Sequence, residues 1–369
     1  MKILQTIKYY EPSKGGMESV AKNLANGIKI VRRNYNLKVV CNNHLISTKN
    51  IKEQLNSIDI FRYKSFFYKS QPISFRFKGL SKDLKDADVI HHHYPYPTME
   101  LALLRNLNIL KSKIFVITWH ANIQNSRWKW IEKFYNPLIK KLLKVSHTIV
   151  VTSPQLLENS TILQDFKHKV KVIPIGFDQS NHFIEKKVLL PIPKLLFVGK
   201  LREYKGLKFL IESIKDLNIH LDIVGNGELE NSLHKLIQEY HLENKIKIHN
   251  RVSDEELEEF YKQANIFVLP SINEAEAFGV VQLEALSYGL PVVNTNLKSG
   301  VPFVSLDGLT GFTVEPKNTI ALKNAIEKII SSDNLYSEFS LNAYKRAKEF
   351  SNKKMVEKYL DIYENIYNR

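Results

Sequence analysis

Two glutamates eight residues apart form the most specific candidate site in the sequence. Glu276 lies in a loop after an apolar strand, and Glu284 lies inside the helix expected from about Gly279. Carboxylates in these positions can accept hydrogen bonds from vicinal hydroxyls. The apolar neighbours of Glu284 predict a buried helix, in which a glutamate needs a partner. The alternative is that Glu284 is an ordinary surface residue of the helix.

Groups suited to binding phosphate lie near these glutamates. The backbone N–H groups of Phe278, Gly279 and Val280 open the same helix, and a helix N-terminus attracts phosphate or sugar oxygens. Lys200 and Lys205 follow an earlier strand, where two cations can neutralise a leaving diphosphate, the role that a metal plays elsewhere. A solvated basic turn is the alternative interpretation of the lysines.

The first half of the chain adds a glycine pair and a histidine. Gly15 and Gly16 lie between the first strand and the first helix, where a diphosphate can approach the backbone closely. An ordinary tight turn is the alternative. His120 ends an apolar strand, so it would either face the crevice at the strand ends or serve as a hydrogen-bonded structural histidine.

Other residues of the first half are weaker candidates. Contacts with an acceptor are expected from Tyr94, Asn122 and Arg127. The run from His91 to His93 suggests a metal site, but successive strand residues alternate between the two faces. No carboxylate or thiolate stands at ligand spacing, so no metal site is expected.

Charge is distributed unevenly along the 369 residues. Residues 1–180 hold 29 Lys and Arg against 12 Asp and Glu, whereas residues 181–369 hold 24 against 26. The asymmetry predicts that one half faces an anionic partner. The densest basic stretch, Arg127–Lys144, mixes tryptophans with lysines and resembles an interfacial membrane helix. The alternative is a surface helix with inward aromatic residues and solvated lysines, which is favoured if Pro137 interrupts the helix.

The rest of the composition indicates the cellular compartment of the protein. No apolar run approaches the ~20 residues that span a bilayer, and the short, polar N-terminal strand does not resemble a secretory signal. A single cysteine, Cys41, excludes a disulfide framework and fits a reducing compartment. A cytoplasmic protein is expected, or one attached to the cytosolic face of the inner membrane.

Strand-like and helical patterns alternate throughout, which predicts an α/β protein with parallel sheets covered on both faces. The alternation restarts near residue 190, after a polar stretch at Gly176–Lys187, so two doubly wound domains are expected. The predicted strands are Lys2–Ile7, Leu37–Cys41, Val89–His93, Ile114–Thr118, Thr148–Thr152, Val170–Ile173, Lys194–Val198, Ile219–Val224, Ile246–Ile248, Ile266–Leu269 and Pro291–Asn294.

Seven segments in order resemble the retaining glycosyltransferases of family 4. The central one is Glu276 and Glu284, separated by seven residues that include Phe278-Gly279. The others include Gly15-Gly16-Met17-Glu18, Thr118-Trp119-His120, Val198–Gly206, Val224–Leu229, Arg251-Val252-Ser253 and Gly300-Val301-Pro302. The resemblance covers nearly the whole chain. It implies the GT-B fold, in which two Rossmann-like domains face each other across a cleft.

The resemblance also implies which part of the chain would bind which substrate. Residues 1–180 would form the acceptor and membrane-facing domain, and residues 181–350 the nucleotide-sugar donor domain. Residues 351–369 would form a C-terminal helix that packs back on the N-terminal domain. In this family Lys205 and Lys200 would stabilise the leaving diphosphate, although an arginine usually replaces Lys200.

The remaining roles follow from the same resemblance. Glu276 would orient the sugar hydroxyls, Glu284 would hold the ribose, and His120 would contact the donor sugar. Arg251 and Val252 would frame the nucleotide base. No divalent metal or other cofactor is implied, because the nucleotide sugar is itself the substrate.

The implied function is transfer of a hexose, with retention of configuration, from GDP-mannose or a UDP-hexose. The acceptor would be a hydroxyl of a lipid-linked or growing surface glycan, of lipopolysaccharide O-antigen or capsule type. The expected partners are the nucleotide sugar, the glycan and an anionic membrane, but no nucleic acid. A sugar-nucleotide epimerase of the same architecture is one alternative, and a non-catalytic polyanion-binding protein is another.

Overall fold

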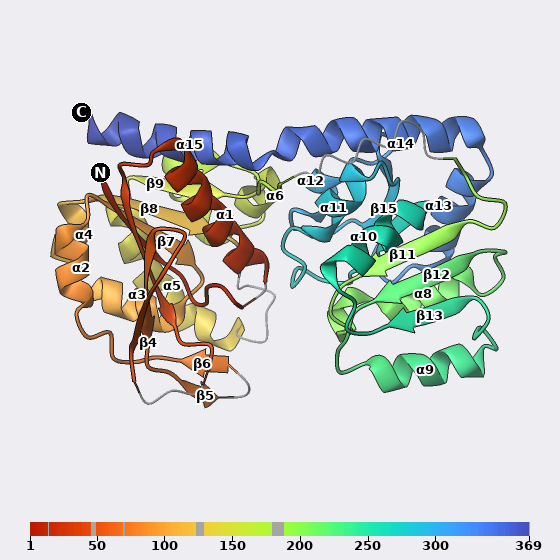
Figure 1. The fold of residues 1–369 in the computed structure, drawn as a ribbon, viewed down its shortest axis with the longest axis horizontal. Coiled ribbons are helices and arrows are strands. Elements are labelled where there is room, and N and C mark those ends of the chain that lie inside the picture. The colour runs from red at the N-terminus through yellow and green to blue at the C-terminus, as the bar shows by residue number, and fades with distance from the viewer. Residues whose placement is uncertain (14, 46–48, 69–70, 123–128, 179–187, 369) are drawn as a thin grey trace. The chain divides into compact units, whose positions relative to one another are not determined.

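The computed structural model describes the chain except for residues 14, 46–48, 69–70, 123–128, 179–187 and 369 (Figure 1). The side chains of residues 67–68, 71–72 and 129–134 also lie outside the description. The chain forms two compact units. Unit 1 comprises residues 1–177 and 352–369, and unit 2 comprises residues 178–351. The last helix therefore belongs to unit 1.

Unit 1 is built on an eight-stranded sheet in the order β10-β9-β8-β7-β1-β2-β4-β3. All neighbours in it are parallel except β3 and β4. A separate antiparallel hairpin joins β5 to β6. The strands are β1 Lys2–Thr6, β2 Asn36–Asn42, β3 Ile51–Leu55, β4 Ile58–Tyr63, β5 Phe66–Tyr68, β6 Gln71–Ile73, β7 Val89–Tyr94, β8 Ile114–Trp119, β9 Thr148–Val151 and β10 Val170–Val172.

The helices of unit 1 bury apolar residues against this sheet. Residues of β7 and β8 are buried throughout, as expected for central parallel strands covered on both faces. The helices are α1 Gly16–Val31, α2 Leu80–Asp86, α3 Pro97–Leu104, α4 Leu107–Lys111, α5 Lys129–Val145, α6 Pro154–Glu158, α7 Thr161–Gln164 and α15 Asn352–Tyr367, with a 3-10 turn at Lys167–Lys169.

Unit 2 is a six-stranded, fully parallel sheet in the order β13-β12-β11-β14-β15-β16. Its strands are β11 Lys194–Val198, β12 His220–Val224, β13 Ile246–His249, β14 Ile266–Leu269, β15 Val292–Thr295 and β16 Gly311–Val314. Its helices are α8 Leu207–Ile214, α9 Glu230–Glu239, α10 Asp254–Gln263, α11 Val281–Ser287, α12 Val301–Val304, α13 Thr319–Ile330 and α14 Asp333–Ala347, with 3-10 turns at Glu203–Lys205 and Lys348–Phe350.

Each sheet has one point where the strand order reverses. In unit 1 it lies between β1 and β7, and in unit 2 between β11 and β14. At such a point the loops after the two strands turn to opposite sides of the sheet and leave a crevice where ligands bind. The loops after β1, β7, β11 and β14 are therefore the ones to inspect for function.

The predicted strand–helix alternation and the two doubly wound units are confirmed, but several details differ. Five strands were not predicted, namely β3, β4, β5, β6 and β16. The apolar pattern is weak in β5 and β6, which are short, and in β3 and β16, which lie at sheet edges. The helix α5 runs through Pro137, which was expected to interrupt it. Burial of Ile139, Leu142 and Leu143 holds this helix although proline removes one backbone hydrogen bond. The helix α11 begins at Val281, two residues later than expected.

The described part of α5 matches the surface-helix alternative. Its residues Tyr135, Ile139, Leu142 and Leu143 are buried, so the apolar face points inward. The lysines of this part face solvent, and Lys140 pairs with Asp165 at 2.6 Å. Among the described residues, no helix has both the length and the hydropathy needed to cross a membrane.

The C-terminal helix α15 lies alongside α1 in unit 1 (Figure 1). Two of its tyrosines are buried and contact the central strands. The hydroxyl of Tyr363 lies 2.7 Å from Nδ1 of His91, and the hydroxyl of Tyr359 lies 2.8 Å from Oγ1 of Thr118. Since Thr118 also bonds Nε2 of His91 at 2.7 Å, α15 completes the hydrogen bonding of a histidine inside the sheet.

Replacing both Tyr359 and Tyr363 with phenylalanine is expected to destabilise unit 1. Each change leaves a buried polar group of β7 or β8 without its partner, at a cost of about 1–3 kcal/mol. Urea denaturation should therefore show a lower free energy of unfolding. The matched control is Tyr367→Phe on the same helix, where the side chain is 51% exposed. An equal effect of the control and the double variant would contradict this role of the tyrosines.

Candidate active site

A buried ion pair lies at the reversal point of unit 2. Nζ of Lys205, in the loop after β11, donates to Oε2 of Glu276, in the loop after β14, at 2.5 Å. The hydroxyl of Ser271 donates to the same oxygen at 3.1 Å. The side chains of Lys205 and Glu276 are only 8% and 11% exposed. The lysine therefore neutralises a carboxylate that burial alone would make costly.

A glycine allows the two loops to approach this closely. Gly206 directly follows Lys205 and adopts a left-handed backbone conformation with φ of 70°. A Cβ atom at this position would meet the carbonyl oxygen of Pro270, at the end of β14, at 2.0 Å. Any side chain would thus push the loops apart and separate Lys205 from Glu276, which explains the glycine.

The second glutamate, Glu284, is half-buried on α11 and has a partner, as predicted. The hydroxyl of Tyr261, on α10, donates to Oε2 of Glu284 at 2.7 Å. Burial raises the pKa of Glu284 above its ordinary value, and the hydrogen bond from Tyr261 opposes that rise. The ring of Tyr261 stacks on Tyr288 at 5.3 Å, which fixes the position of the phenol.

The backbone between the two glutamates offers hydrogen-bond donors. Within the described part of the chain, no group accepts a hydrogen bond from the N–H of Phe278, Gly279 or Val280. The sequence predicted that these three groups open the helix, and they lie directly before it because α11 begins at Val281. Lys200 is exposed and makes no ion pair with a described residue, so its charge is available to an anion.

The predicted base-framing segment follows β13. Arg251 is exposed and has φ of 55°, and Val252 is half-buried. Ser253 and Glu256 form the reciprocal capping arrangement expected at the start of α10. The backbone turn at Arg251 and the capped start of α10 are therefore both present directly after β13.

In unit 1, His120 is joined to another histidine. Nε2 of His120 lies 2.9 Å from Nδ1 of His93, and the two rings are stacked at 5.2 Å. Burial lowers the pKa of His120 to about 3 and lowers that of His93 well below its ordinary range. Both imidazoles are therefore neutral at physiological pH, and His120 can act as a hydrogen-bonding group but not as a cation.

The other histidines of β7 have structural partners. His91 lies between Tyr363 and Thr118, and burial lowers its pKa to about 3. On the opposite face, Nδ1 of His92 lies 2.7 Å from Oγ1 of Thr6, and Nε2 lies 3.2 Å from Glu100 on α3. No group of three potential metal ligands is found among the described residues.

The other predicted residues of unit 1 have varied positions. Gly15 caps the N-terminus of α1 and Gly16 begins it, and a Cβ atom at residue 16 would project into open space. Tyr94, predicted to touch an acceptor, is only 3% exposed, because its ring stacks on Trp119 in the core. The same ring system holds Asn122, whose side-chain oxygen accepts a hydrogen bond from Nε1 of Trp119 at 2.7 Å. Arg127 lies outside the described residues.

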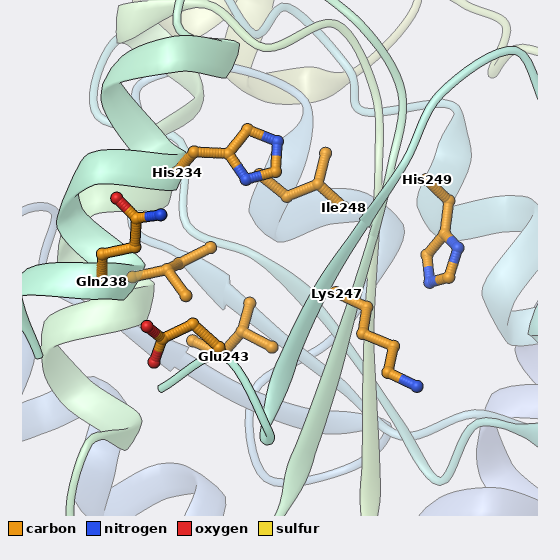
Figure 2. A pocket seen from close by; sticks show the side chains of 8 residues that line it. His234, Gln238, Glu243, Lys247, Ile248 and His249 are labelled. Atoms are coloured by element: carbon orange, nitrogen blue, oxygen red, sulfur yellow. The ribbon is translucent and has the colours of Figure 1, made fainter. Parts of the chain in front are cut away.

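A shallow pocket of about 350 Å³ lies elsewhere in unit 2 (Figure 2). One wall comes from α9 and the loop after it, with His234, Gln238 and Glu243, and the other comes from the edge strand β13. None of the predicted donor-binding residues lines it. His249 also lines the pocket, and its Nε2 lies 2.7 Å from Oδ1 of Asp222.

Sequence reasoning missed the groups that support these side chains. Ser271 and Tyr261 bind the two glutamates, and His93 binds His120. A signal for Tyr261 was available, since a glutamate on an apolar helix needs a donor and this tyrosine lies on the otherwise acidic α10. For His93, the sequence suggested the metal site that the alternation of strand residues argued against.

Comparison with known proteins identifies the family. The model described as Glycosyltransferase Family 4 matches residues 14–181, and the model described as Glycosyl transferases group 1 matches residues 180–346. D-rhamnosyltransferase WbpZ of Pseudomonas aeruginosa is 30% identical over 284 residues, which cover 74% of this chain and 72% of that protein. The chain belongs to glycosyltransferase family 4.

Two further similarities cover the whole glycosyltransferase. O-antigen chain mannosyltransferase C of Escherichia coli is 26% identical over 375 residues, or 99% of both chains. The structure of Anabaena HepE in complex with UDP and glucose has a TM-score of 0.71 at 18% identity, over 99% of this chain and 100% of that chain. The predicted family and the GT-B class of fold, with two Rossmann-like units, are confirmed.

A double-mutant cycle tests the buried ion pair of this glycosyltransferase. Lys205→Met and Glu276→Gln should each lower the free energy of unfolding by about 3 kcal/mol, because each leaves a buried charge without its partner. The double variant should lose much less than the sum of the two. Lys200→Met is the matched control, and its exposed side chain should change stability by less than about 0.5 kcal/mol. Additive losses in urea denaturation would contradict the coupling.

The raised pKa of Glu284 predicts a pH dependence of stability. A carboxyl whose pKa is higher in the folded state binds more protons when folded, over the range upward from its ordinary value of 4.5. Stability should therefore fall as pH rises through that range. Thermal denaturation from pH 4.5 to neutrality should show this fall in the wild type relative to Glu284→Gln. Glu255→Gln, at an exposed position, should leave the pH profile unchanged.

Proposed function

We propose that this glycosyltransferase moves a hexosyl group from a nucleoside-diphosphate sugar to a hydroxyl of a lipid-linked or growing surface glycan. The reaction would retain the anomeric configuration and need no divalent metal or other cofactor. Support for the acceptor class comes from the relatives, one of which is named for O-antigen chains. GDP-mannose and the UDP-hexoses are the candidate donors.

One observation carries the proposal: the buried pair of Lys205 and Glu276 at the reversal point of unit 2. A lysine at a strand end supplies fixed positive charge where a diphosphate leaves. Glu276 has Oε2 engaged by Lys205 and Ser271, and its remaining oxygen can orient a sugar hydroxyl. Lys200 adds a second, exposed cation, which lacks the bidentate fork of the arginine common in the family.

The other roles rest on the resemblance and on the contacts described above. Glu284, held by Tyr261, accepts hydrogen bonds from the ribose, and Arg251 and Val252 frame the base. The N–H groups of Phe278, Gly279 and Val280, together with the N-terminus of α1 at Gly15-Gly16, bind diphosphate oxygens. Neutral His120 contacts the donor sugar, with His93 fixing its ring.

The chemical step that fits these groups is a front-face substitution. The bond from the anomeric carbon to the diphosphate oxygen breaks, and the acceptor oxygen bonds to the same face of that carbon. The acceptor proton passes to an oxygen of the departing diphosphate, which leaves with the electron pair. A double displacement would need a carboxylate nucleophile, and Glu276 is held by a lysine and a serine instead. Trapping a glycosyl adduct on a carboxylate of the enzyme would exclude this step.

Lipid-linked acceptors place the proposed reaction at a membrane. Unit 1 contains nearly all of the residues that give the first half its excess of positive charge. We therefore propose a cytoplasmic enzyme that associates peripherally with the anionic cytosolic face of the inner membrane. One relative is named as a mannosyltransferase and another as a D-rhamnosyltransferase, so the donor is tested directly.

Donor binding is measured by thermal shift against UDP, GDP, ADP and their sugar conjugates, with and without EDTA. A ligand that binds the folded state raises the melting temperature by mass action. We expect a shift with one nucleotide family, unchanged by EDTA and lost in Glu284→Ala. Glu255→Ala, at an exposed position of α10, serves as the control.

Transfer itself is then followed by NMR of the product anomer with a water-soluble acceptor. A product with the configuration of the donor supports the proposal. Donor consumption without an acceptor, giving an epimerised sugar nucleotide, would favour an epimerase. Binding of DNA in a salt-sensitive manner without any nucleotide-sugar binding would favour a polyanion-binding protein.

A further inference from the structure

A short aromatic and basic segment of unit 1 has no role in the site described above. Residues 64–78 contain five aromatic and four basic side chains and no acid. The segment includes the hairpin of β5 and β6, which forms its own two-stranded sheet apart from the main one. We refer to the described residues of this segment, 64–68 and 71–78, as the aromatic hairpin.

Two phenylalanines of the aromatic hairpin are exposed. The side chains of Phe66 and Phe75 are 49% and 60% exposed. No other phenylalanine in the described part of the chain is exposed to this degree. Their rings stack on each other with centroids 5.4 Å apart. Water-exposed aromatic surface of this kind is costly unless a partner covers it.

The base of the aromatic hairpin is fixed to the body of unit 1. The hydroxyl of Ser65 donates to the carbonyl of Asn43, outside the hairpin, at 2.6 Å, and that of Ser74 joins the two ends of the hairpin by donating to the carbonyl of Lys64 at 2.7 Å. Phe77 points inward and makes an edge contact with Tyr63 at 4.9 Å. The exposed pair is therefore held outward by a firmly attached base.

Positive charge surrounds the exposed pair. Lys64, Arg76 and Lys78 are exposed, and no carboxylate of the described residues pairs with them. Apolar rings flanked by lysine and arginine are suited to the boundary between acyl chains and anionic headgroups. The described part of α5 differs, because its apolar residues are buried and only its lysines face solvent.

We propose that the aromatic hairpin inserts Phe66 and Phe75 into an anionic lipid surface and so attaches unit 1 to the membrane. Lipid fits better than a glycan, because one face of each ring is covered by the other ring and phenylalanine offers no hydrogen bond to a sugar. This inference rests on the proposed function, because a lipid-linked acceptor is what would bring the enzyme to a membrane. It adds a second element to the membrane contact predicted at Arg127–Lys144, where the side chains of residues 127–134 lie outside the description.

The first test measures sedimentation of the full chain with vesicles of phosphatidylglycerol and phosphatidylcholine, or of phosphatidylcholine alone. We expect binding to the anionic vesicles and a loss of about tenfold or more in Phe66→Ser with Phe75→Ser. The matched control is Ile320→Ser with Leu341→Ser, which removes two exposed apolar side chains from unit 2. It should bind as the wild type does. Equal binding by both double variants would overturn the proposal.

A second test reports insertion without removing both rings. The native cysteine, Cys41, is buried, so an environment-sensitive fluorophore will label a new cysteine selectively. Label on Phe75→Cys should gain intensity and shift to the blue with anionic vesicles, and label on Ile320→Cys should not. An unchanged spectrum at residue 75 on bound protein would overturn insertion. Loss of glycan binding, with vesicle binding intact, in the Phe66 and Phe75 double variant would assign the hairpin to an acceptor instead.

Transfer to a water-soluble acceptor separates this inference from the proposed function. The serine variants of Phe66 and Phe75 should retain that activity and lose only membrane binding. If the wild type transfers no sugar but binds vesicles through the hairpin, the proposed function fails and the inference stands. If transfer is normal and vesicle binding is insensitive to the hairpin, the inference fails and the function stands.

Discussion

A charge removed from water must find a partner, and this requirement governs the candidate site of unit 2. Lys205 and Glu276 belong to loops that are 71 residues apart in sequence, after strands that are neighbours in the sheet. Their ion pair is possible only because Gly206 lets one loop touch the end of β14. A ligand with its own negative charge would thus meet a lysine already held in place.

Unit 1 meets the same requirement by a different route. The buried, neutral imidazoles of His91, His93 and His120 bond one another, Thr118 or a tyrosine of α15. Burial keeps His91 and His120 uncharged, so the network needs no counter-ion. The last helix of the chain therefore serves the same sheet that carries His120.

The surface of unit 1 depends on which side chains its core buries. The described part of α5 buries its apolar face, which leaves the lysines as its contribution to the surface. The aromatic hairpin has the opposite arrangement, since Phe66 and Phe75 point outward while Phe77 packs inward. In the proposed membrane contact, the lysines would attract an anionic surface and the two phenylalanines would insert into it.

The sequence by itself determined the class of fold, the two units, the family and most of the candidate donor residues. These are local properties, because apolar periodicity, glycine positions and the spacing of Glu276 and Glu284 are all visible in one dimension. The partners of these residues were decided only by the tertiary structure. Tyr261 with Glu284, His93 with His120, and α15 with His91 come together through strand order and helix packing, over separations of up to 272 residues. The same is true of exposure, since which face of α5 or of the hairpin meets water depends on neighbours that no local pattern specifies.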